Sequence, residues 1–424
     1  MADSAELAEF AHDLQSSLHR TSIPEFDHLP MVGMAAIVAL HLRGLGEIDY
    51  GVLKQVSEHY FDVPAMVLPQ VLDVLADVEY VTLVTIGKSI RTVIPSVPHF
   101  KSVYEGLGEY LNNQDLTEHE ELCCGILREL TEKPEKRDTI FSRLGADKST
   151  FDRSERIVTH GGLVVPKRAR GQAILVSPTY FADNLDGLAD MAAAGNSPRI
   201  QKLLKTLKTA QGWPLSLVLQ RGEINGVKLD TVEMQLLRSL VADGILRPPS
   251  IERAGGSEHF IFTPRPGKAR LDAANREVYE RAMALVAAVR KGQLLPEKYR
   301  IHSPGALLSK LRDQKVIGAS SEAAQQYKSL ASLRVGKLVK TQGDRYQFHL
   351  IDTEENVRAV NEAIGLIQTG NLTGGSVKEE ARIALQQDEK YVQSLVAAHK
   401  FREVEKPQLD EEGRREVEQL LLDL

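Results

Sequence analysis

One pattern recurs four times along the 424-residue chain: a short apolar stretch, a loop with glycine or basic residues, and a second short apolar stretch. The four copies lie at residues 79–95, 161–178, 243–264 and 336–351. Comparable positions on the returning stretches are separated by 82, 86 and 87 residues, as measured at Ile94, Val176, Phe262 and His349. Self-similarity at a nearly fixed spacing is typical of tandem arrays of small units. We therefore expect a unit of about 85 residues to repeat along the chain.

The second copy shows which elements precede each predicted hairpin. Thr117 and Glu120 form a potential capping box before EELCCGILREL, whose apolar residues recur at helical spacing. RDTIFSRLG predicts a short second helix, and Asp147 or Ser149 can cap a third helix, STFDRSERIVTH, which ends at a pair of glycines. In the fourth copy, the three corresponding helices are predicted at REVYERAMALVAAVRKG, SPGALLSKLRDQK and SSEAAQQYKSLASLR.

Three helices followed by a hairpin resemble the winged-helix superfamily, and the resemblance covers about residues 28–351. It depends on the order of the elements, because no diagnostic motif is present. The resemblance implies a mainly α fold with short β-hairpins, arranged as a tandem array of about four winged-helix (helix-turn-helix plus wing) domains and a C-terminal helical segment. The expected parts are an acidic N-terminal arm at 1–27, winged helices at 28–98, 99–181, 182–266 and 267–351, and an acidic helical segment at 352–424 that is either separate or a degenerate fifth unit.

Charge is strongly segregated along the chain, although the formal net charge is only −6. Residues 1–27 carry one Arg against six acidic residues, and residues 351–424 carry nine Lys or Arg against sixteen. Residues 197–350, in contrast, carry 26 Lys or Arg against 13 Asp or Glu. A basic middle section between acidic ends favours a polyanionic partner, and we expect duplex DNA to bind there.

The resemblance indicates where such contacts would lie, because the third helix of a DNA-binding winged helix enters the major groove while the wing holds phosphates. In the second copy, basic residues gather at these two places: Arg143, Lys148, Arg153 and Arg156 near the third helix, and Lys167, Arg168 and Arg170 on the wing. The alternative is a solvated charged surface whose pairs, such as Asp152 with Arg156, serve only the helix.

The fourth copy offers a more complete set of candidate DNA-binding residues. Gln325 and Lys328 lie on the polar side of its predicted third helix, together with Ser321 and Ser329. Gln and Lys can recognise adenine and guanine edges, respectively, and cations on the wing can contact phosphates. The wing cations are Lys337, Lys340 and Arg345, and Lys310, Arg312 and Lys315 lie on the preceding helix. A merely solvated polar face remains the alternative.

The first and third copies are weaker candidates for DNA contact. In the third copy, Lys202, Lys205 and Lys208 alternate with apolar residues on the first helix, so they are a phosphate-facing stripe or only keep that helix soluble. In the first copy, residues 28–95 carry four basic and seven acidic residues. Its predicted third helix bears Val63, Met66, Val67, Val71 and Val74, which either form a self-association or partner-binding surface or fill the unit's own core.

Chemical motifs are weak throughout, and we expect no catalytic residues, no metal site and no cofactor. Gly87-Lys88-Ser89 lacks the upstream glycine of a phosphate loop. His119 and Cys123 are one helical turn apart without further metal ligands at suitable spacing, and the adjacent Cys123 and Cys124 are expected to be buried small hydrophobes. An acidic N-terminus and the lack of 18 consecutive apolar residues predict a cytoplasmic protein that does not enter a membrane.

The sequence thus predicts a non-enzymatic DNA-binding protein that uses basic wings and third helices. A regulator or a component of a DNA-maintenance, plasmid or defence system would fit these features. The alternative is an architectural adaptor whose winged helices bind proteins. In either case, the first unit and the acidic C-terminal segment are candidates for self-association or for binding a protein partner.

Overall fold

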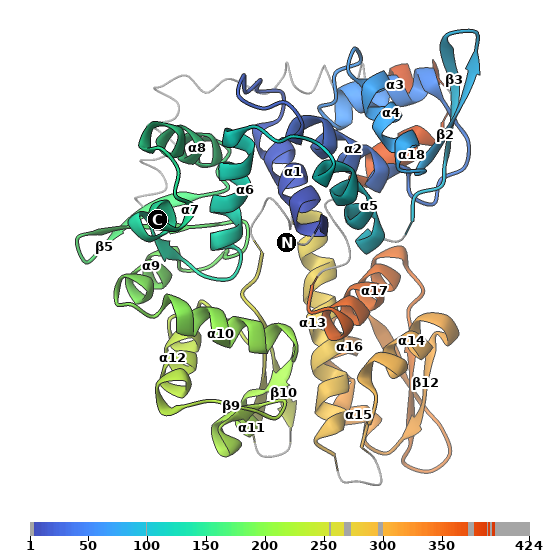
Figure 1. Cartoon of the computed structure of the whole chain (residues 1–424). Helices are drawn as coiled ribbons and strands as arrows, with labels where there is room; N and C mark the ends of the chain where they lie inside the picture. Colours follow the sequence, from blue (N-terminus) through green and yellow to red (C-terminus); the bar gives the residue numbers. More distant parts are fainter. Residues whose placement is uncertain are drawn as a thin grey trace, which may run out of the picture. The chain divides into compact units, whose positions relative to one another are not determined.

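A computed structural model describes residues 4–98, 100–253, 256–266, 273–295, 300–371, 377–387, 389–390 and 392–394 (Figure 1). The described chain is mainly helical, with small antiparallel sheets of two or three strands, which confirms the expected mainly α class with short hairpins. Among these residues, no helix is both long enough and apolar enough to cross a membrane. The chain divides into two compact units, one of residues 34–98 and 378–424 and the other of residues 1–33 and 99–377.

The smaller unit contains the first copy. Helix α2 (Leu29–Leu42) enters it and is followed by β1 (Ile48–Asp49), α3 (Tyr50–Tyr60), α4 (Leu68–Asp77), β2 (Val81–Ile86) and β3 (Ser89–Pro95). The sheet has the order β1-β3-β2 and is antiparallel throughout. The Asp49 carboxylate caps α3 by accepting from the backbone N–H of Gly51 at 2.7 Å. The chain therefore passes from β1 into α3 without an intervening loop.

A C-terminal helix, α18 (Glu379–Leu385), packs on α3 within the same smaller unit. The backbone N–H of Lys378 donates to Nε2 of the buried His41 at 2.9 Å, and Arg382 donates to the carbonyl of Arg43 at 2.9 Å. Lys378 also donates through Nζ to the carbonyl of Tyr60. These cations bind carbonyl groups at the C-terminal ends of α2 and α3, where the helix dipole favours positive charge.

The larger unit begins with α1 (Ser4–Leu18), which packs on α5 (Phe100–Asn112). Residues 1–27 were expected to form an acidic arm, yet the apolar side of α1 is fully packed, with Phe10 and Leu14 buried. Gly108 permits the close approach of the two helices, because a Cβ at this position would overlap the backbone of Ser4. The apolar residues of α1 recur at helical spacing, which explains why this segment folds as a packed helix.

The second copy follows with α6 (Glu118–Leu130), β4 (Glu135–Lys136), α7 (Arg137–Leu144), α8 (Lys148–His160), β5 (Val165–Ala169) and β6 (Gln172–Val176). Its sheet has the order β4-β6-β5. The predicted capping box at Thr117 and Glu120 is present, and Asp147 caps α8 by accepting from the backbone N–H of Ser149. The local start signals that the sequence carries therefore set the beginnings of both helices.

The third copy contains more elements than the sequence predicted. After α9 (Leu185–Ala193) come α10 (Ser197–Lys208), β7 (Trp213–Pro214), α11 (Leu215–Arg221), β8 (Glu223–Ile224), β9 (Val227–Lys228), α12 (Thr231–Ala242), β10 (Ser250–Arg253) and β11 (Gly256–Ile261). The three-stranded sheet has the order β10-β11-β7, and β8 and β9 form a separate small hairpin between α11 and α12. Asp230 and Glu233 form a capping box at the start of α12.

The fourth copy differs from its expected helix assignment. Helix α13 (Ala273–Gln293) is followed by α14 (Pro304–Gln314), β12 (Val316–Ser320), α15 (Ala323–Gln326), α16 (Lys328–Ser332), β13 (Gly336–Lys340), β14 (Tyr346–Leu350) and α17 (Glu354–Gln368). The predicted single third helix is two short helices separated at Tyr327. The extended strand β12 follows α14 because Lys315, at φ 60°, ends that helix in the left-handed conformation.

The four copies share one element order once α13 and the small β8–β9 hairpin of the third copy are set aside: helix, strand, helix, helix, strand, strand. In each copy the last strand lies in the centre of the sheet, between the first strand and the second. The four hairpins predicted from the sequence are confirmed at their segments, whereas the first strand of each sheet was not predicted. Three of these first strands are only two residues long, which is too short to show an alternating pattern.

The third and fourth copies share part of their core within the larger unit. The buried face of α13 belongs to one apolar cluster with Phe260 of β11, with Phe262 just after that strand, and with Phe348 of β14. Helix α17 closes this cluster with Val360 and Ala363, both fully buried. The long helix α13 therefore joins the two copies instead of serving as the first helix of the fourth.

Candidate nucleic-acid interface

The predicted cation Arg153 on α8 is held by an acidic residue of the same chain. Its Nε lies 2.6 Å from Oε1 of Glu25, and its Nη2 lies 3.1 Å from Oε2. The hydrogen bond from Arg153 holds the pKa of Glu25 below its ordinary value. Neighbouring Asp152 and Glu155 on α8 both bind Arg137, at 2.5 and 2.7 Å. The exposed side of α8 therefore mixes the two signs of charge and is largely neutralised.

The second wing is neutralised in a similar way by helix α9, which packs against β5 and β6. Lys167 forms an ion pair with Asp186 at 3.0 Å, and Arg170 binds Asp190 through two parallel contacts of 2.9 and 2.8 Å. Two of the three predicted wing cations thus face carboxylates at the positions where phosphates were expected. Arg168 is exposed and has no carboxylate partner among the described residues.

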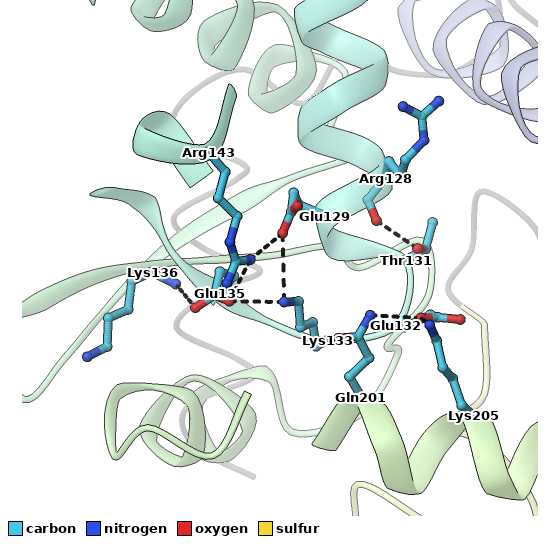
Figure 2. A network of polar contacts seen from close by, with 10 residues as sticks. All are labelled: Arg128, Glu129, Thr131, Glu132, Lys133, Glu135, Lys136, Arg143, Gln201 and Lys205. Carbon is cyan, nitrogen blue, oxygen red and sulfur yellow. Dashed lines mark hydrogen bonds and ion pairs between the residues drawn. The ribbon is translucent and has the colours of Figure 1, made fainter. Parts of the chain in front are cut away.

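Arg143 belongs to a polar network at the base of the second copy (Figure 2). It contacts Glu129 at 2.6 Å and Glu135 at 3.2 Å, and Glu135 in turn binds Lys133 at 3.1 Å. Lys133 and Glu135 are 6% and 5% exposed, so this pair is an internal element of the fold. The position of Arg143 is therefore better explained by its contact with the buried Lys133–Glu135 ion pair than by DNA binding.

The predicted third-copy cations also have structural partners. Lys205 on α10 binds Glu132 at 3.1 Å, and Gln201 donates to the same carboxylate at 3.0 Å (Figure 2). Lys202 binds the buried Glu233 of α12 at 2.6 Å. These contacts give Lys202 and Lys205 a structural role on α10, which differs from both predicted alternatives, a phosphate-facing stripe and lysines that only keep the helix soluble.

Two cations of α8 remain outside these pairs. Lys148 and Arg156 are exposed and have no carboxylate partner among the described residues. Arg156 donates through Nε to the carbonyl of Asp152 at 3.3 Å, so the predicted i,i+4 pair uses the backbone oxygen. A shallow surface hollow over α8 is lined by both basic and acidic side chains, including Arg137, Asp152, Glu155, Arg156 and His160.

The fourth copy presents a different surface. Lys328 at the start of α16 and Lys337 and Lys340 on β13 are exposed, and none has a carboxylate partner in the described part of the chain. Helix α16 packs directly against β13, so the three cations belong to adjoining elements. Lys310 on α14 is likewise exposed without such a partner in that part. In the second copy, by contrast, Arg153, Lys167 and Arg170 are paired with carboxylates.

Three other fourth-copy cations are engaged. Arg312 binds its neighbour Asp313 at 2.7 Å, and Lys315 binds Asp352 at 2.7 Å. Arg345 donates to the carbonyl of Ala319 at 2.7 Å, which ties the wing to β12. The charges of Arg312 and Lys315 are therefore compensated by carboxylates, and the guanidinium of Arg345 is anchored to a backbone carbonyl, whereas Lys337 and Lys340 have neither kind of partner among the described residues.

The neighbours of Gln325 explain its position on the surface. Gln326 is buried and donates to the carbonyl of Ala288 on α13 at 2.9 Å, which anchors α15. The backbone oxygen of Gln325 accepts from Lys291 at 3.2 Å, while its side chain is exposed. Ser329 was expected on the same polar side, but its hydroxyl is buried and has no hydrogen-bond partner among the described residues.

Helix α12 carries two candidate residues that were not predicted from the sequence. Gln235 and Arg238 are exposed one turn apart, and neither has a polar partner in the described structure. Arg334, at φ 56° before β13, is also exposed. Asp230 and Glu233 form a capping box at the start of α12, and this signal is present in the sequence. The exposed side of α12 could therefore have been predicted from the helical spacing of its apolar residues.

The first copy shows how the apolar residues near its third helix are used. Val63, Val71 and Val74 are buried in the core, and Met66 is exposed at 90%. The exposed side of α4 instead carries Gln70, Asp73 and Asp77. The structure thus favours the interpretation in which most of these valines fill the unit's own core, and α4 presents acidic residues that would repel phosphate.

The two cysteines lie inside the second copy, on α6. Burial raises the pKa of Cys124 to about 12 and raises the pKa of Cys123 well above its ordinary value. Both thiols are therefore protonated at neutral pH, which suits buried small side chains. Within the described residues, no group of three or more His, Cys, Asp or Glu is arranged to hold a metal ion.

Similarity to known proteins adds no further assignment to this geometry. No protein-family model matches the chain, and no curated protein is detectably similar to it in sequence.

Proposed function

We propose that this chain is a non-enzymatic DNA-binding protein built from four tandem winged-helix units. The repeated order of helix, strand, helix, helix, strand, strand supports the proposal, as does the central position of the last strand in each sheet. Both features are those of a helix-turn-helix followed by a wing. The adjoining helices and hairpins provide the two kinds of surface, groove-facing and phosphate-facing, that duplex binding requires.

The observation that carries the proposal is the unneutralised basic surface of the fourth copy. Lys328 lies at the start of α16, and Lys337 and Lys340 lie on the first strand of the adjoining wing. Each is exposed and lacks a carboxylate partner among the described residues, so none must break an ion pair before it binds a phosphate. Release of counterions from DNA then drives binding.

The third copy supplies a second surface in the same unit. Gln235 and Arg238 on α12 can hydrogen-bond to adenine and guanine edges, respectively, if the exposed side of α12 enters a major groove. Lys202 and Lys205 have no part in this proposal, because they bind Glu233 and Glu132.

A salt-dependent titration of a labelled duplex tests the proposal. The variant Lys337→Gln with Lys340→Gln should lower the slope of log affinity against log salt by roughly 2 units, since each cation neutralises about one phosphate. The control variant Lys54→Gln with Arg91→Gln removes two exposed cations of the first copy, and the slope should remain that of the wild type.

Two results would contradict DNA binding through the fourth copy. One is an absence of duplex binding by the folded wild-type chain at low salt. The other is an equal loss of slope in both double variants, because charge alone, and not its position, would then be responsible. Single-stranded DNA of the same length serves as the competitor that distinguishes duplex binding from general polyanion binding.

The first copy favours a second function, that of a protein-binding adaptor. Asp73 and Asp77 are exposed on α4, the helix that corresponds in order to α8 and α12. An acidic surface at this position is unsuited to phosphate and suits a basic protein partner. DNA titration of the Lys337→Gln with Lys340→Gln variant separates the two functions, because the adaptor function predicts that these substitutions have no effect on DNA affinity.

A further inference from the structure

The first strand of each predicted hairpin is an edge strand of its sheet: β2, β5, β10 and β13. An exposed edge has unpaired backbone donors and acceptors, and proteins commonly protect it with charged residues or proline. Strand β5 carries Pro166, Lys167 and Arg168, and β13 carries Lys337 and Lys340. Strand β10 carries Glu252 and Arg253. Three of the four edges therefore have the residues that discourage pairing with another strand.

Strand β2 is the exception among these four edges. Its six residues, VTLVTI, include no charged residue and no proline. Val84 and Ile86 are 40% and 70% exposed, and Ile94, which lies across from Thr82 on β3, is 40% exposed. These side chains share one side of the hairpin, since residues alternate between the two sides of a strand. The edge is thus long, uncharged and bordered by exposed apolar surface.

The charges at the two ends of β2 indicate which strand can pair with it. Glu79 precedes the strand and Lys88 lies in the turn that follows it, and both are exposed. A second copy of the same strand in antiparallel orientation brings each Glu79 near the Lys88 of the other chain. A parallel arrangement would bring like charges together. The charges of two β2 strands are therefore complementary only when the strands are antiparallel and related by a twofold axis, which is the symmetry of an isologous dimer.

We propose that two copies of this chain associate by antiparallel pairing of their β2 edge strands. The pairing joins the two three-stranded sheets into one, satisfies the outward backbone groups of both edges and places Val84 and Ile86 beside the partner's strand. The inference does not depend on DNA binding, because every residue in it belongs to the first copy.

Sedimentation equilibrium of the full chain, over about two decades of concentration, measures this association. The wild type should show a monomer–dimer equilibrium, and Val84→Lys with Ile86→Lys should raise the dissociation constant at least about tenfold, since four lysines would meet at the joint. Met66→Lys is the matched control. It places a charge on a 90% exposed apolar side chain of the first copy that is not part of β2, and should leave the dimer unchanged.

A charge exchange tests the antiparallel geometry. At low salt, Glu79→Lys and Lys88→Glu should each weaken the dimer by roughly 2–30-fold, because each creates two like-charge contacts across the joint. The double variant, E79K with K88E, should restore the wild-type constant. The two residues lie at opposite ends of the strand, on the order of 20 Å apart within one chain, so restoration must arise between chains.

Three results would overturn the proposal: a wild type that stays monomeric, a dimer insensitive to V84K with I86K, or a double charge exchange no tighter than either single variant. A Met66→Lys variant that dissociates would equally place the interface elsewhere. Circular dichroism and melting temperature confirm folding, and the exposed positions of Glu79 and Lys88 keep the charge exchange informative if the strand variants fail to fold.

Discussion

Arg153 and Glu25 are 128 residues apart in sequence and form a two-contact ion pair, with distances of 2.6 and 3.1 Å. The backbone oxygen of Glu25 also accepts from the Thr117 hydroxyl at 2.7 Å, so the segment before α2 is tied to the second copy at two points. A cation that the winged-helix resemblance assigned to DNA is therefore used to fix the N-terminal segment.

The first prediction concerns the pH dependence of this pair. Because hydrogen bonding to Arg153 lowers the pKa of Glu25, the folded state is stabilised at pH values above the ordinary carboxyl pKa. That contribution disappears as the pH falls through the lowered folded-state pKa. We expect Glu25→Gln to lower the melting temperature at neutral pH; the difference from wild type should shrink as the pH falls below about 4.5, the ordinary carboxyl pKa, and vanish below the lowered pKa of the folded state. A difference that stays constant with pH would contradict this origin.

The second prediction concerns the neutralised wing of the second copy. Replacing Asp186 and Asp190 by Asn should free Lys167 and Arg170, which these carboxylates now bind. If the array binds DNA as proposed, duplex affinity should rise and the salt slope should steepen by up to about 2 units. Asp73→Asn with Asp77→Asn removes the same charge from the first copy and provides the control. Equal gains in both variants would show that only net charge matters.

The third prediction tests the buried carboxylate that organises the start of α2. Oε1 of Glu120 accepts from the backbone N–H groups of Asp27, His28 and Leu29 at 2.9, 2.7 and 2.7 Å. Glu120→Ala should cost about 2–4 kcal/mol in chemical denaturation, because several buried donors lose their acceptor. Glu121→Ala, at an exposed position on the same helical turn, should change the free energy of unfolding by less than about 0.5 kcal/mol.

The fourth prediction concerns the buried ion pair of Figure 2. Glu135→Ala leaves the ammonium of Lys133 buried without its closest partner, and we expect a cost of about 3–5 kcal/mol. Replacing both residues by apolar ones, Lys133→Met with Glu135→Leu, should destabilise the protein less than Glu135→Ala alone. Chemical denaturation measures the free energy of unfolding of both variants. Lys205→Ala breaks only the more exposed ion pair with Glu132 and serves as the control, with a small expected cost.

The fifth prediction concerns the thiols. Burial raises the pKa values of Cys123 and Cys124, so thiolate is scarce in the folded protein at pH 8. A disulfide reagent should label neither cysteine in the native chain and both after denaturation. Fast labelling of native protein would show that α6 opens locally far more often than its packing implies.

Local signals in the sequence determined much of the secondary structure. The capping residues Thr117, Glu120 and Asp147 set the starts of α6 and α8, and the spacing of apolar residues set their buried sides. The four hairpins also followed from short apolar stretches around turns. These features could be predicted because hydrogen bonding to a cap and side-chain periodicity involve residues only a few positions apart.

Tertiary structure alone decided which cations remain available. Arg153, Lys167 and Lys337 look alike in the sequence, yet the first two face Glu25 and Asp186 while Lys337 lacks a carboxylate partner among the described residues. It also decided that β12 precedes α15 in the fourth copy, because Val316 and Ile317 become extended by pairing with His349 and Phe348. Ion pairs and strand partners join positions 19 to 128 residues apart in these cases, and local spacing cannot specify such long-range proximity.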